Sequence, residues 1–65
     1  QEKMEQILAT LNQNQGRTTF TKLFRKVSRR REALALFLAL LELIRLQKVK
    51  AFQKVPWGDI QLEKW

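Results

Sequence analysis

The apolar residues of the first third of the chain follow the spacing of an amphipathic helix. They recur at intervals of three and four residues, which places them along one helical face: Met4, Ile7, Leu8 and Leu11. The helix is expected to end near Asn14, because Gly16 can take the left-handed backbone conformation just beyond that end.

A short strand and a short helix are predicted next. Residues 17–20 combine two β-branched threonines with a phenylalanine, a composition that favours a strand. Thr21 is the expected N-cap of a brief second helix. Leu23 and Phe24 would face inward from this helix, with Val27 as a further candidate.

The longest predicted helix runs from residue 29 to residue 47. Ser28 is its expected N-cap, and Glu32 in the first turn suits the helix dipole. At about 100° per residue, one side of the helix collects Ala33, Leu36, Phe37, Leu40, Leu43, Ile44 and Gln47. The opposite side carries Arg31, Ala35, Leu38, Glu42 and Arg45, and two more leucines lie on the shoulder between the sides.

This helix has a wider apolar arc than a single core requires. Four of its residues form a continuous surface that we call the hydrophobic ridge: Leu34, Phe37, Leu38 and Leu41. A domain of this size can cover about half of the ridge, and exposed apolar patches on proteins usually mark contact surfaces. The ridge therefore predicts a protein partner, with cover by the first helix, by the N-terminal arm or by a second copy as the alternatives.

Beyond residue 47 the hydrophobic period changes from that of a helix to that of a strand. Two apolar pairs alternate with polar residues there: Val49 with Ala51, and Ile60 with Leu62. Pro56 is expected to end the first strand, and residues 58–59 to supply a tight turn. Phe52 interrupts the alternation and is predicted to point to the outer face of this hairpin.

The order helix, short strand, helix, helix, hairpin predicts an α+β fold, the winged helix. Three helices supply a helix-turn-helix core, and the C-terminal β-hairpin is the wing. A chain of 65 residues allows one domain, residues 1–65. Because the chain starts at Gln1 rather than at a methionine, we expect a fragment of a longer protein.

Composition excludes several kinds of site. Without cysteine there is neither a disulfide nor a thiolate metal site, as in proteins of a reducing compartment. Without histidine the commonest metal ligand and proton shuttle are missing. The carboxylates are scattered, and the two glycines form no phosphate-binding loop. We therefore expect no enzymatic activity, no cofactor and no small-molecule substrate.

No stretch approaches the roughly 20 apolar residues that span a bilayer, so no membrane partner is expected. The formal charge of +7 is concentrated in what we call the basic patch: Lys22, Arg25, Lys26, Arg29, Arg30 and Arg31. Such a patch attracts phosphate or an acidic protein surface, although a solvated charged turn has the same composition. The outward side of the third helix has few hydrogen-bond donors, which argues against reading of bases in the major groove.

The predicted hairpin carries one further candidate contact residue. Trp57 lies at its tip, where tryptophan is a frequent binding anchor; the alternative is that it folds back over Phe52. Trp65 is expected to pack against the first helix. The outer hairpin strand has an unpaired edge, which can accept a strand from a partner.

The central and C-terminal residues resemble a known family. The run from Phe37 to Leu46, followed by Val49-Lys50 and then by residues 56–60, resembles the C-terminal domain of the kleisins, most closely the segregation and condensation protein A (ScpA) family. Residues 18–30 also fit this pattern. The leucine helix joined to the Pro-aromatic-Gly-Asp turn is the specific part of the resemblance, which covers residues 18–62.

The resemblance implies a winged helix that binds the ATPase head of an SMC protein and helps to close a ring used in chromosome segregation and condensation. It also implies a cytoplasmic, nucleoid-associated protein whose other parts bind the ScpB subunit. The family contacts map onto Phe37, Leu41 and the strands around Phe52 and Ile60. With the ridge and the wing tip, the candidate head-binding residues are Leu34, Phe37, Leu38, Leu41, Phe52, Trp57 and Ile60.

The sequence departs from the family pattern in one place, and two functions other than head binding stay open. Lys54-Val55 stands where the family tends to carry acidic residues, which puts charge complementarity with the head in doubt. The first rival is a DNA-binding winged helix that uses the segment from Lys22 to Arg31 and the wing, with non-specific DNA contact. The second is a domain that buries its ridge against its own copy.

Overall fold

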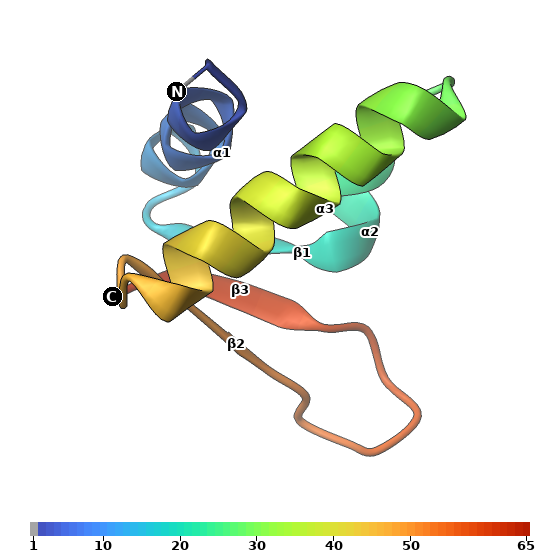
Figure 1. The fold of residues 1–65 in the computed structure, drawn as a ribbon. Helices are drawn as coiled ribbons and strands as arrows, with labels where there is room; N and C mark the ends of the chain where they lie inside the picture. Colours follow the sequence, from blue (N-terminus) through green and yellow to red (C-terminus); the bar gives the residue numbers. More distant parts are fainter. Residues whose placement is uncertain (1) are drawn as a thin grey trace.

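The computed structural model describes residues 2–65, in which three helices pack on one face of an antiparallel sheet (Figure 1). In chain order the elements are α1 (Glu2–Gln13), β1 (Arg17–Thr19), α2 (Phe20–Phe24), α3 (Arg30–Arg45), β2 (Val49–Phe52) and β3 (Gln61–Lys64). This is the predicted order, and the α+β architecture with a C-terminal hairpin is that of a winged helix.

The last strand of the chain lies in the middle of the sheet. The strand order is β1-β3-β2, with both neighbours antiparallel to β3. Leu62 of β3 pairs with Thr18 on one side and with Ala51 on the other. Since opposite residues share a face of a sheet, these three side chains lie on the face covered by the helices.

The core forms where α1, α3 and that face meet. Its buried residues are Ile7, Leu11, Leu23, Leu36, Ala39, Leu40, Leu43, Val49 and Leu62. The helical periods predicted most of them, but two expectations were wrong. Gln47 is exposed because it lies beyond the end of α3. Ala51 is exposed although it pairs with the buried Leu62, because the helices no longer cover the wing at this position.

Both long helices end in left-handed residues that satisfy the last carbonyl groups. At the end of α1, Gln15 and Gly16 have φ of 61° and 82°, and the Gly16 N–H donates to the Leu11 carbonyl at 2.7 Å. The predicted role of Gly16 is confirmed, with Gln15 as an unpredicted companion. At the end of α3, Gln47 has φ of 60°, and the Lys48 N–H donates to the Leu43 carbonyl. Both hydrogen bonds are of the Schellman type.

The predicted N-caps of α2 and α3 were wrong. Thr19, not Thr21, caps α2: its hydroxyl accepts a hydrogen bond from the Lys22 N–H at 3.1 Å. Arg29, not Ser28, stands at the N-cap position of α3 and makes no capping hydrogen bond with its side chain. Both cap residues have an extended backbone, and each helix begins at the residue that follows.

The wing is a short hairpin with a long loop. β2 ends at Phe52 rather than near Pro56, and residues 53–60 connect it to β3. The tight turn lies earlier than predicted, since the Gly58 N–H donates to the Val55 carbonyl at 3.0 Å around Pro56 and Trp57. This loop projects away from the helices (Figure 1). Within residues 2–65, no helix is both long and apolar enough to cross a membrane.

Candidate protein-docking surface

The hydrophobic ridge lies on the side of α3 that faces away from the core. Leu34, Leu38 and Leu41 are 57%, 55% and 45% exposed, and Phe37 is 38% exposed. The same helix buries Leu36, Ala39, Leu40 and Leu43 against the rest of the domain. Neither α1 nor the sheet therefore covers the ridge, and a contiguous apolar surface along about two helical turns faces solvent.

The two sides of the ridge border different elements. On one side, Phe37 meets Phe20 edge-on with ring centroids 6.3 Å apart, and Phe20 stacks on Phe24 at 4.3 Å. This contact holds Phe37 in place and accounts for its lower exposure. On the other side, Leu38 lines a shallow hollow between α3 and α1, whose lining residues are Lys3, Met4, Ala35, Leu38, Ala39 and Glu42.

A charged pair closes the C-terminal end of the ridge. Arg45 donates to both carboxylate oxygens of Glu42, with 2.9 Å between Nε and Oε1. This hydrogen bonding from Arg45 lowers the pKa of the Glu42 carboxyl group. The two charges pair with each other about one turn beyond Leu41, so the apolar surface ends at a polar rim.

The hairpin candidates do not join the ridge in one patch. Phe52 pairs with Gln61 on the face of the sheet turned away from the helices, as predicted, and is 38% exposed. Ile60 is partly buried against the core, and its carbonyl accepts a hydrogen bond from the Phe20 N–H at 2.9 Å. The predicted docking residues therefore lie in three places: the α3 ridge, the outer face of the sheet, and the wing loop.

The two tryptophans are both largely exposed. Trp57 is 85% exposed at the wing tip, so it does not fold back over Phe52. Trp65, predicted to pack on the first helix, is 66% exposed and lies beside β2, with Lys50 Nζ 5.8 Å from its ring centroid. Of the two, Trp57 has the geometry of a binding anchor.

Sequence analysis missed two exposed apolar residues. Leu46 at the end of α3 is 42% exposed, and Val55 in the wing loop is 44% exposed. Leu46 gave no periodic signal, because it lies just beyond the last residue of α3 and outside the ridge. Val55 had no periodic signal, because the loop has no regular structure.

A link between the wing and α2 was also missed. Asp59 Oδ1 accepts a hydrogen bond from the Thr21 N–H at 3.4 Å, in the first turn of α2. Hydrogen bonding from the Thr21 side chain, with smaller contributions from nearby backbone N–H groups, lowers the pKa of the Asp59 carboxyl group. The base of the wing loop is thus attached to the helix that supports Phe37.

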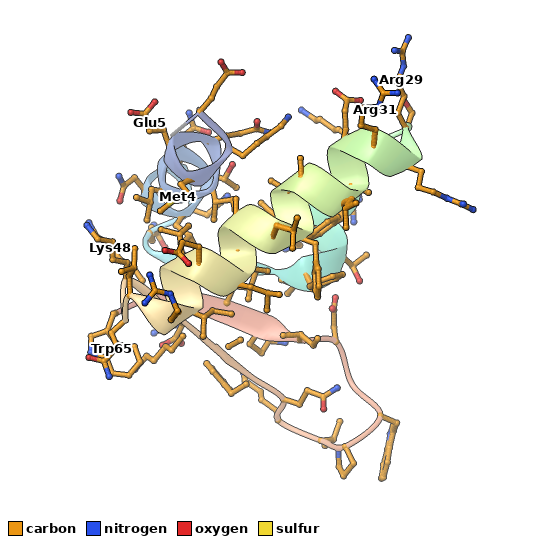
Figure 2. The ribbon with its side chains drawn as sticks, in the orientation of Figure 1. Met4, Glu5, Arg29, Arg31, Lys48 and Trp65 are labelled. Atoms are coloured by element: carbon orange, nitrogen blue, oxygen red, sulfur yellow. The ribbon has the colours of Figure 1, made fainter. Side chains whose placement is uncertain are left out.

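The basic patch occupies the turn from α2 to α3. All six of its side chains are exposed. In Figure 2, Arg29 and Arg31 lie at the N-terminal end of α3 and Lys48 near the other end. The residues described include no cluster of acidic, histidine or cysteine side chains suited to a metal ion.

Comparison with known proteins identifies the family. The family model of the segregation and condensation protein ScpA matches residues 1–64. The chain belongs to the ScpA family. ScpA proteins are non-enzymatic structural subunits of SMC complexes that act in chromosome segregation and condensation, and they are cytoplasmic and nucleoid-associated. The resemblance found in the sequence is confirmed, and so is the prediction of a non-enzymatic function. No match to a curated protein or to a solved structure reaches significance.

Proposed function

We propose that this chain is the C-terminal winged-helix domain of an ScpA kleisin and that its hydrophobic ridge docks onto the ATPase head of an SMC protein. The observation that carries the proposal is the exposure of all four ridge residues on the outward side of α3, in a domain whose other face is well packed. Family membership supports SMC as the partner. The chain would then act as an adaptor that tethers the head to the rest of the kleisin, with ScpB bound elsewhere in the protein.

The geometry supports a division of roles within this surface. The leucines of the ridge would enter an apolar groove, while Phe37 is held by Phe20 and therefore loses little freedom on binding. Trp57 would add a separate contact at the wing tip, where a large exposed aromatic ring can fill a pocket. Phe52 and Ile60 would contribute less, since one lies on the far face of the sheet and the other is partly buried.

Isothermal titration of the chain against an SMC head tests the proposal. We expect Leu41→Lys to weaken binding by at least about tenfold, because a charge placed within an apolar contact must be desolvated. Leu46→Lys is the matched control: it makes the same substitution at a leucine of similar exposure, 42% against 45%, outside the ridge.

Circular dichroism must show that both variants fold. Equal affinities of folded Leu41→Lys and the unmodified chain would refute the ridge as the docking surface. Loss of binding in both variants would place the contact at the C-terminal end of α3 instead. Light scattering on the chain alone would show whether a second copy covers the ridge in the absence of the head.

A further inference from the structure

The docking proposal leaves the exposed basic patch without a role. The ion pairs among residues 2–65 join other cations to carboxylates: Arg17 and Lys50 to Glu63, and Arg45 to Glu42. Within that range none of these pairs involves a residue of the patch. Six exposed positive charges therefore stand within ten residues of sequence, and Glu32, which directly follows them, forms no ion pair with any of them.

The fold adds to the positive potential of this region. α3 starts inside the patch, and its N-cap residue Arg29 makes no capping hydrogen bond with its side chain. The free N–H groups of a helix start carry a partial positive charge, so arginines at positions 29, 30 and 31 are unfavourable for the isolated domain. The side chains of Arg29 and Arg31 project from this free end of α3 (Figure 2). An anion bound here would relieve that repulsion.

The side chains around the charges indicate which kind of anion fits. Between the cations, Leu23 is buried, and Phe24 and Val27 are partly buried against the core. The patch therefore lacks the exposed apolar anchors that form the centre of a protein interface. It also lacks exposed aromatic rings on which unpaired bases could stack. Four of its six cations are arginines, whose guanidinium groups suit phosphate oxygens.

Base recognition is not supported by the adjoining helix. The outward side of α3 next to the patch presents Leu34, Leu38 and Leu41, which offer no hydrogen bonds to base edges. Contact would then be limited to the sugar-phosphate backbone, which positions a protein without reading sequence.

We infer that the basic patch binds the phosphate backbone of duplex DNA without sequence preference. The α2–α3 turn contacts the duplex, while the ridge on the next turns of α3 stays free for the protein partner. The inference does not depend on the identity of that partner, since the two surfaces use different residues.

Fluorescence anisotropy of the chain with a short labelled duplex provides the test. The logarithm of the binding constant is expected to fall with the logarithm of the salt concentration with a slope between about −3.5 and −5.5, as for four to six neutralised phosphates. Two duplexes of unrelated sequence should bind equally, and single-stranded DNA of the same length more weakly.

The decisive variant is Arg29→Glu combined with Arg30→Glu. Acidic residues at a helix start are favourable, so this double variant should fold at least as well as the unmodified chain. We expect it to bind DNA at least tenfold more weakly at about 50 mM salt and to reduce the salt slope by about 2. The control is Lys48→Glu with Lys54→Glu, two exposed residues outside the patch, one just before β2 and one in the wing loop, whose replacement changes the net charge equally. The affinity of this control for DNA should fall by less than about threefold.

Three results would overturn the inference. They are an absence of DNA binding at low salt, equal losses in the two double variants, and tighter binding of single-stranded DNA. Weaker binding of an SMC head by the Arg29/Arg30 variant, without any DNA binding by the unmodified chain, would assign the patch to the protein interface and would likewise refute the inference.

Discussion

Two glutamines hold the left-handed conformation that glycine adopts most readily. Gln15 and Gln47 have φ near +60°, each just past the end of a long helix. The left-handed conformation costs a residue with a β-carbon about 1–2 kcal/mol. The helices nevertheless end at these points because Gly16 and Lys48 donate to the Leu11 and Leu43 carbonyls, which would otherwise lack partners.

Gln47→Gly is therefore expected to stabilise the domain. Removal of the backbone strain outweighs the extra conformational freedom that glycine gives the unfolded chain. The free energy of unfolding should therefore rise by about 0.5–1 kcal/mol. Chemical denaturation would measure it. Gln6→Gly, at an exposed position inside α1, is the control and should cost about 1 kcal/mol. A loss of stability in Gln47→Gly would contradict the assigned backbone conformation.

At the scale of elements, α2 is stabilised by hydrogen bonds to other parts of the chain as well as by its own. This helix has only five residues, and its first N–H groups are satisfied by the Ile60 carbonyl, the Asp59 carboxylate and the Thr19 hydroxyl. Two of these three partners belong to the base of the wing. α2 in turn supports Phe37 through Phe20, so the wing and one side of the ridge are coupled through α2.

The Asp59 contact should make stability depend on pH. Because the pKa of Asp59 is lowered in the folded state, its contribution is complete above the ordinary aspartate pKa of about 3.9 and is lost as the pH falls through the lower folded-state value. Asp59→Asn should reduce the melting temperature at pH 7, and the difference from the unmodified chain should shrink at strongly acidic pH. Glu5→Gln, at an exposed position of α1, is the control. A difference that is constant with pH would exclude the carboxylate as its source.

The sequence predicted those elements that depend on local periodicity. The stripe of α1, the buried Leu36, Leu40 and Leu43 of α3 and the hairpin all follow from spacing, and so does the exposure of the ridge. The start of α2 and the attachment of the wing did not follow, because Asp59 and Thr21 are 38 residues apart in sequence. The break in the alternation at Phe52 did predict its position on the face of the sheet turned away from the helices.

At the scale of the whole molecule, stability and docking reside in different side chains. The interior depends on a small set of fully buried residues, among them Leu43 and Leu62 at 0% exposure. The candidate contacts of the ridge and the wing tip lie outside this set. A domain of this size has little stability in reserve, so the two sets of residues should respond differently to truncation.

A pair of alanine variants tests this separation. Leu43→Ala should cost about 2–5 kcal/mol and leave much of the chain unfolded at room temperature. Trp57→Ala should change the free energy of unfolding by less than about 0.5 kcal/mol while weakening binding to an SMC head by about tenfold. Thermal melts and titration of the same samples measure both effects. Unchanged affinity in Trp57→Ala would remove the wing tip from the docking surface.

The position of β3 between its two neighbours has a consequence for synthesis. While a ribosome is still adding residues 53–60, the helices have already been made, but neither β1 nor β2 has a strand to pair with. The place of Leu62 in the interior is empty until β3 leaves the exit tunnel. A stall in the wing loop would therefore leave apolar surface exposed to proteases until β3 joins the sheet.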